Sequence, residues 1–257
     1  TDDDLLGPLI AMDKAGRSPY ARKVRTWLCQ VFDWAVATKQ ASTNPARSIQ
    51  PRHAFRRVPV KHFKALPLSA VGKFLRDIRA RKGASVHACR LLMLTWARTN
   101  EVIKMRWAEI DGDVWTVPES RMKRRKAHVV PLPRQAVEIL DQLRIFARSE
   151  FVFTHPSDHD KPMSTNAILA LIKKTGYKGQ TTGHGFRSMA STWANERGFS
   201  PDVIEIQLSH VPEDRVRAAY NRADYFNQRK ALAQAWADWL DQEELGSPSA
   251  KSTASSR

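Results

Sequence analysis

The chain has 257 residues, enough for one large domain with a hydrophobic core and a smaller second piece. Its 42 Lys and Arg residues against 26 Asp and Glu give a net charge of +16, which favours nucleic acid or another polyanion as the partner. No apolar stretch approaches the ~20 residues of a membrane-spanning helix, and two single cysteines, Cys29 and Cys89, fit a reducing cytoplasm without a disulfide framework or a zinc site.

Residues 1–48 predict part of a helical domain. An apolar segment near residues 5–12 and apolar residues at three- and four-residue steps over 19–38 predict two helices. Two helices are too few for an independent core, and the chain begins without Met. We therefore expect this piece to belong to a longer protein or to lean on the rest of the chain.

Residues 49–67 predict a basic linker. No acidic residue occurs between Trp34 and Arg76, and Pro51, Pro59 and Pro67 argue against regular structure. We expect the linker to follow a phosphate backbone, although an ordinary solvated basic loop explains the same composition.

Residues 68–245 predict the main domain, which is mainly α with a small β-sheet or hairpin. Two short strands are expected at Val114–Val117 and Ala127–Val130, and the tail, 246–257, lacks apolar periodicity and is expected to be disordered. Helices are expected at 68–78, 86–96, 134–147, 164–175, 186–197, 201–208 and 225–243.

Basic residues gather in the linker and between the two strands. Nine residues join the strands and five of them are basic, which is typical of a loop that grips phosphates. The residues predicted to bind DNA are Arg52, Arg56, Arg57, Lys61, Lys64, Arg121, Arg124, Arg125 and Lys126.

Arg98 follows a strongly apolar helix, and a guanidinium in such a place needs a partner because an unpaired buried charge is costly. Glu101 stands three residues on and can orient it. A purely structural Arg98–Glu101 ion pair explains the same two residues.

Residues His184 and Arg187 share one face of a predicted helix start, where Gly183 and Gly185 allow close approach to a ligand. A planar guanidinium can bind two phosphate oxygens, and an imidazole can exchange a proton near neutral pH. Taken alone, a polar helix turn explains the pair equally well.

Tyr220 stands in the sequence Ala-Ala-Tyr-Asn, ten residues after His210. Tyrosine serves some enzymes as a covalent nucleophile, but its usual pKa of about 10 leaves little phenolate at neutral pH. A half-buried packing role is the ordinary alternative for such a residue.

The combination of these motifs resembles the tyrosine recombinases (phage-type integrases), nearest to those of P4-like phages and genomic islands. Arg98-Thr-Asn-Glu101, Gly183-His-Gly-Phe-Arg187 and Leu208-Ser-His210 carry the resemblance. Met122-Lys123 ahead of Val129-Val-Pro-Leu132, and Ala218-Ala-Tyr-Asn221, add to it. The pair Trp96-Ala97 departs from the Gly-containing pair often found before the first arginine.

The resemblance implies a site-specific integrase that cuts and rejoins DNA through a 3′-phosphotyrosyl intermediate, without a metal ion or other cofactor. Tyr220 is then the nucleophile and Lys123 the acid that protonates the leaving oxygen, while Glu101 supports Arg98. It also implies a homo-tetramer on double-stranded attachment sites, joined through the C-terminal helix, with accessory DNA-bending proteins and a nucleoid location. The residues it assigns to catalysis are Arg98, Lys123, His184, Arg187, His210 and Tyr220.

Three alternatives stay open at this stage. A type IB topoisomerase uses a similar set of residues to relax supercoils, and a non-catalytic DNA-binding regulator would need the basic surface but not Tyr220. The apolar stripe of the last helix, Leu232, Trp236, Trp239 and Leu240, packs either on a neighbouring protomer or on its own domain.

Overall fold

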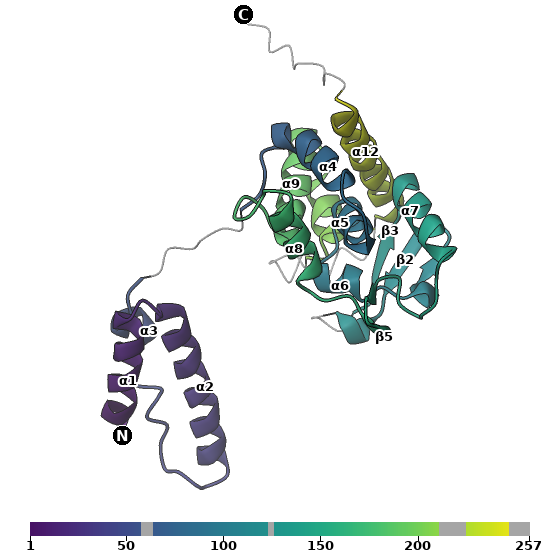
Figure 1. The fold of residues 1–257 in the computed structure, drawn as a ribbon. Helices are drawn as coiled ribbons and strands as arrows, with labels where there is room; N and C mark the ends of the chain where they lie inside the picture. The colour runs from purple at the N-terminus through teal and green to yellow at the C-terminus, as the bar shows by residue number, and fades with distance from the viewer. Residues whose placement is uncertain (58–63, 123–125, 211–224, 247–257) are drawn as a thin grey trace, which may run out of the picture. The chain divides into compact units, whose positions relative to one another are not determined.

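The computed structural model describes residues 1–57, 64–122, 126–210 and 225–246. The chain forms two compact units, Thr1–His62 and Phe63–Arg257 (Figure 1). No helix in these described ranges is long and apolar enough to cross a membrane.

The first unit contains α1 (Asp2–Lys14), α2 (Ser18–Ala37) and the short α3 (Pro51–Ala54). Its small core joins Leu9 of α1 and Ala21 of α2 to Ile49 and Phe55, which flank α3. Several apolar side chains of α2 that the helical pattern had marked stay exposed. These are Tyr20, Trp27, Val31 and Trp34.

The linker prediction is wrong for residues 49–56, which belong to the first unit. Ile49 and Phe55 are buried, and α3 is helical in spite of Pro51, which occupies the first turn where a missing N–H costs nothing. The Arg22 guanidinium donates to the carbonyl groups of Phe55 and Arg56 at 3.1 and 3.0 Å and holds the segment in place.

The second unit is mainly helical with two small antiparallel sheets, as the sequence predicted. A three-stranded sheet has the order β1 (Ile110–Asp111), β2 (Val114–Val117) and β3 (His128–Pro131), and a hairpin pairs β4 (Thr154–His155) with β5 (Asp158–Pro162). The expected second strand begins one residue late, and β1, β4 and β5 were not predicted because they are short and mostly polar. Its helices are α4 (Val71–Arg79), α5 (Ala84–Thr95), α6 (Thr99–Ile103), α7 (Arg134–Arg144), α8 (Ala167–Lys174), α9 (Gly183–Glu196), α10 (Pro201–Gln207) and α12 (Phe226–Leu245).

Helix α5 lies at the centre of this unit, and its buried side chains are covered by α7, α8, α9 and α12 (Figure 1). It ends at Trp96, whose backbone has the left-handed conformation, with φ 60°. That conformation costs a residue with a side chain about 1–2 kcal/mol. Burial of the indole against Trp236, with 6.1 Å between ring centroids, offsets this cost and explains how Trp96 can replace a glycine.

Helix α12 packs on its own domain. Its stripe of Leu232, Trp236, Trp239 and Leu240 is buried against α4, α5, α9 and α10, so the first of the two expected partners, a neighbouring protomer, does not cover these side chains here. The end of α12 is held closely by α4. A Cβ atom placed on Gly72 would lie 2.2 Å from the Glu243 carbonyl oxygen.

Candidate active site

Arg98 lies at the N-terminus of α6, directly after the turn that ends α5. Its Nη1 donates to Glu101 Oε1 at 2.9 Å, and its backbone N–H donates to Glu101 Oε2 at 2.8 Å. Its Nη2 lies 3.4 Å from the Ser209 carbonyl oxygen. Glu101 thus orients Arg98 as expected, while the Arg98 side chain stays 37 % exposed.

Arg187 lies on the first turns of α9 and is only 4 % exposed. Its guanidinium donates to the carbonyl oxygens of Trp96 and Leu208 and lies 3.3 Å from His210 Nε2. Burial, followed by the nearby charge of Arg98, lowers the pKa of Arg187 to about 10, so the group is still a cation at neutral pH.

Two imidazoles stand beside the guanidinium groups. His210 follows α10, and its Nδ1 lies 2.9 Å from Glu205 Oε2. That contact leaves Nε2 of His210 on the side of Arg187. Burial, then Arg187 and Arg98, lowers the pKa of His184, so its imidazole is neutral at pH 7 and able to accept a proton.

The glycines around His184 serve the packing of the protein itself. A Cβ atom on Gly183 would lie 2.4 Å from Thr99 Oγ1, and one on Gly185 would lie 2.3 Å from the Lys64 carbonyl oxygen. Gly183 also lines the cavity described below, and the expectation that the glycines allow a ligand to approach stays a prediction. They bring the start of α9 against α6, which carries Arg98, and against the first described residues of the second unit.

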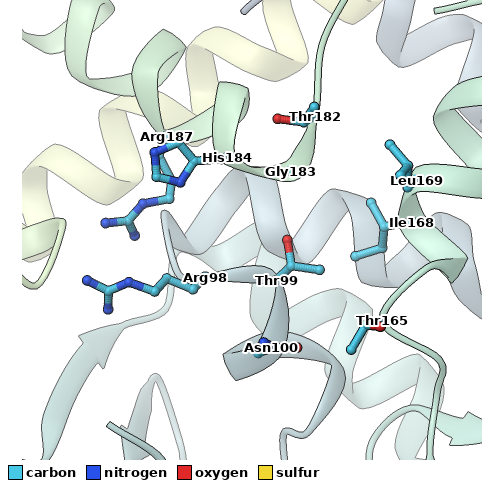
Figure 2. Close-up of a pocket in the computed structure, with 10 residues that line it drawn as sticks. All are labelled: Arg98, Thr99, Asn100, Thr165, Ile168, Leu169, Thr182, Gly183, His184 and Arg187. Atoms are coloured by element: carbon cyan, nitrogen blue, oxygen red, sulfur yellow. The ribbon is translucent and has the colours of Figure 1, made fainter. Parts of the chain in front are cut away.

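A cavity of about 360 Å³ borders this group of residues (Figure 2). The side chains of Arg98 and Arg187 extend in the same direction in Figure 2, away from Leu169 and Thr165 at the opposite end of the cavity. The two guanidinium groups also bond to the adjacent carbonyls of Leu208 and Ser209. Two cations, the buried Arg187 and the partly exposed Arg98, thus lie together with His184 and His210, an arrangement suited to hold a phosphate group.

A buried polar layer beneath the site was missed by the sequence reasoning. Arg229, 2 % exposed, donates from Nε to Gln207 Oε1 at 3.0 Å and also bonds to the Val129 carbonyl. Gln207 Nε2 in turn donates to the Thr95 carbonyl at 3.2 Å. Burial, then Arg229, lowers the pKa of His128 to about 3. In the sequence, the signal for this layer was that Thr95 stands three residues before Arg98 and Gln207 three residues before His210.

The remaining predicted residues fall into three groups. Lys123 and Tyr220, with Lys61, Arg124 and Arg125, lie outside the described residues. Arg121 is bonded to protein groups, namely the Glu109 carboxylate and two backbone carbonyls, which argues against the predicted contact with DNA. The exposed side chains predicted to bind DNA are Arg52, Arg56, Arg57, Lys64 and Lys126.

Comparison with known proteins places this arrangement in a family. The phage integrase family matches residues 73–226, and the phage integrase central domain matches residues 1–52. The chain is 37 % identical over 245 residues to the integrase of Shigella phage Sf6, covering 93 % of this chain and 63 % of that protein. It is 35 % identical over 260 residues to the integrase of Enterobacteria phage P4, covering 92 % and 58 % of the two chains. The chain belongs to the phage integrase (tyrosine recombinase) family.

Solved structures share the fold. A lambda integrase dimer bound to a core site has a TM-score of 0.64 and 19 % identity, with 88 % of this chain and 65 % of that chain covered. The Tn1549 transposon integrase bound to circular intermediate DNA has a TM-score of 0.67 and 16 % identity, with 90 % and 84 % covered. The chain spans only about three fifths of the length of the phage integrases named above.

Proposed function

We propose that this chain is the catalytic part of a site-specific DNA recombinase of a mobile element such as a prophage, acting on double-stranded attachment sites in the bacterial cytoplasm. The observation that carries the proposal is that Arg98, Arg187, His184 and His210 lie close together. Membership of the phage integrase family supports it.

In the proposed reaction Tyr220 attacks a scissile phosphodiester, forming a 3′-phosphotyrosyl bond as the bond to the 5′-oxygen breaks. Arg98 and Arg187 bind the non-bridging oxygens and stabilise the charge of the transition state, and His210 adds a hydrogen bond. His184 accepts the phenolic proton, and Lys123 donates a proton to the leaving 5′-oxygen. One ester replaces another, so a free 5′-hydroxyl can reverse the step and rejoin strands without a nucleotide cofactor.

The burial of Arg187 supports a role in the transition state. Its guanidinium is fixed by three protein partners before any DNA binds. A donor that is already oriented needs no reorganisation during the reaction. Arg98, anchored at one side by Glu101 and partly exposed, leaves room for an incoming phosphate.

The assembly of the complex is also a proposal. Lambda integrase has been solved as a dimer on a core site and as a tetramer on a Holliday junction. We expect a tetramer here as well, with accessory DNA-bending proteins. Because the stripe of α12 is buried in its own domain, contacts between protomers must come from other surfaces unless that helix detaches.

The test is covalent capture of DNA. A library of nicked duplexes with a randomised central segment is incubated with the chain, and adducts that survive denaturation are isolated and sequenced. The parent chain should capture a defined sequence, whereas Tyr220→Phe should capture none. An adduct formed by Tyr220→Phe would refute the assignment of the nucleophile.

Two outcomes would favour the alternatives. Tight binding with no adduct from any duplex would favour a non-catalytic DNA-binding regulator. Relaxation of a plasmid that lacks the captured sequence would favour a topoisomerase.

A further inference from the structure

Arg121 has an environment unlike that of the other basic residues in its segment. Its side chain is 17 % exposed, and it forms an ion pair with Glu109, which is 10 % exposed. Burial lowers the pKa of Arg121 from its usual value, and the Glu109 charge acts in the opposite direction. An ion pair that is buried to this extent indicates that Arg121 connects parts of the protein and does not bind DNA.

The guanidinium of Arg121 joins three parts of the domain. It donates to the backbone carbonyls of Glu101, at 3.3 Å, and Lys104, which close the C-terminal end of α6. It also bonds to Glu109, whose Oε2 accepts from the Trp115 indole N–H at 3.1 Å. The end of the η3 turn (Glu119–Arg121) is thereby attached both to α6 and to β2.

Glu101 connects this attachment to the proposed active site. Its carboxylate holds Arg98 through two hydrogen bonds, while its backbone carbonyl accepts from Arg121. Arg98 and Arg121 therefore bond to the same residue, one at its carboxylate and the other at its backbone carbonyl.

Lys123 follows Arg121 by two residues in the sequence. Met122 is 7 % exposed and its N–H donates to the Glu119 carbonyl at 3.0 Å. After residues 123–125, Lys126 and Ala127 are exposed. Lys123 thus follows directly on a residue that is packed in the protein, and it lies itself outside the described residues.

We propose that Arg121 is a positioning residue for the proposed general acid, because its bonds to Glu101 and Glu109 fix the backbone from which Lys123 departs relative to Arg98. This inference rests on the proposed function, in which Lys123 protonates the leaving 5′-oxygen. Arg121 touches neither the DNA nor the reacting atoms.

The test uses two nicked duplexes with the sequence captured by the parent chain. One has the natural 5′-oxygen at the scissile bond, and the other has sulfur in its place. A thiolate leaves without a proton near neutral pH because thiol pKa values are about 8.5, so cleavage of the P–S bond does not need the general acid. Single-turnover rates of adduct formation on both duplexes separate a misplaced acid from a damaged active site.

We expect Arg121→Met to slow cleavage of the oxygen duplex by roughly 10- to 100-fold, within the range that general acid catalysis contributes, and to leave cleavage of the sulfur duplex near the parent rate. Lys123→Met should show the same pattern with a larger loss. Arg121→Lys keeps a charge beside Glu109 but cannot reproduce the forked contacts with the α6 carbonyls, so it should fall between parent and Arg121→Met.

Two further variants control for folding. Arg121→Met with Glu109→Gln removes both charges, leaves no unpaired carboxylate, and should keep the sulfur-specific pattern. Arg134→Met removes an exposed arginine paired with Glu138 on α7 and should cleave both duplexes like the parent. Circular dichroism of each variant monitors folding.

The outcomes distinguish the two proposals. Equal slowing on both duplexes by Arg121→Met and by the double variant would overturn the positioning role, because a merely structural defect does not depend on the leaving group. Equal slowing by Lys123→Met would instead remove Lys123 from the proposed mechanism. Failure of the parent chain to form any adduct would overturn the proposed function and this inference with it.

Discussion

The close approach of α4 to the end of α12 predicts that one added methyl group at Gly72 destabilises the second unit. Gly72→Ala places a methyl group 2.2 Å from the Glu243 carbonyl oxygen, so one helix must shift. At Gly7, inside α1, a methyl group would meet no atom beyond the neighbouring residues and the helix's own backbone, but Pro8 follows and its ring crowds the Cβ of a preceding helical residue. This crowding opposes the gain of about 0.5–1 kcal/mol from the reduced freedom of the unfolded chain, and any net effect of Gly7→Ala falls on the first unit.

The magnitude at Gly72 follows from the cost of overpacking. Inserting one methyl group into a tightly packed contact typically costs about 1–3 kcal/mol. In a domain of this size each kcal/mol lowers the melting temperature by about 2–4 °C. Gly72→Ala should therefore lower the melting temperature of the second unit by about 2–12 °C.

Near-ultraviolet circular dichroism is a suitable assay, because the second unit contains the packed indoles of Trp193, Trp236 and Trp239. The indoles of Trp27 and Trp34, in the first unit, are exposed. A melting temperature of Gly72→Ala equal to the parent's would refute the reasoning, and with it the packing of α12 on its own domain. The control, Gly7→Ala, should leave the signal of these packed indoles unchanged.

Three further predictions concern the proposed active site. The pKa of His184 lies below the usual 6.5, and it is the neutral imidazole that accepts the proton. The single-turnover cleavage rate should therefore be constant around pH 7 and fall when the pH is lowered through that pKa. A rate that rises on acidification would contradict the proposed base. Glu205→Gln removes the charged partner of His210 and should slow cleavage about 2- to 5-fold, because a pair that is nearly half exposed is worth at most about 1 kcal/mol. DNA affinity in a gel-shift assay should stay unchanged, and parent-like cleavage would contradict the prediction. Arg229→Met leaves Gln207 and a backbone carbonyl without their buried donor. It should lower the free energy of unfolding of the second unit by about 2–5 kcal/mol in urea. A decrease below about 0.5 kcal/mol would show that the buried polar layer is dispensable for stability.

Much of the fold was predictable because its helices have strong apolar periodicity. The expected helix over 86–96 is α5, Ala84–Thr95, and the expected helix over 225–243 is α12, Phe226–Leu245. The weak elements were missed. Helix α6 has five residues and is defined by Arg98 and Glu101 at its start rather than by periodicity.

Part of the candidate site was predictable for a different reason. The local motifs identified Arg98, His184, Arg187 and His210, and the structure brings these four together. Sequence alone could not separate Arg121 from its basic neighbours, because what distinguishes it is the position of Glu109 and of the α6 carbonyls. Contacts of this kind depend on how distant segments meet, which composition does not encode.

The turn after α10 has a consequence for how this protein can vary. Leu208 and Ser209 offer adjacent carbonyls to the two arginines, Ser209 has φ 51°, and His210 follows at once. A shift of these few atoms would displace three of the proposed phosphate ligands together. Substitutions here should therefore abolish or preserve function as a whole, so mutational tuning of specificity has to act through residues elsewhere in the domain.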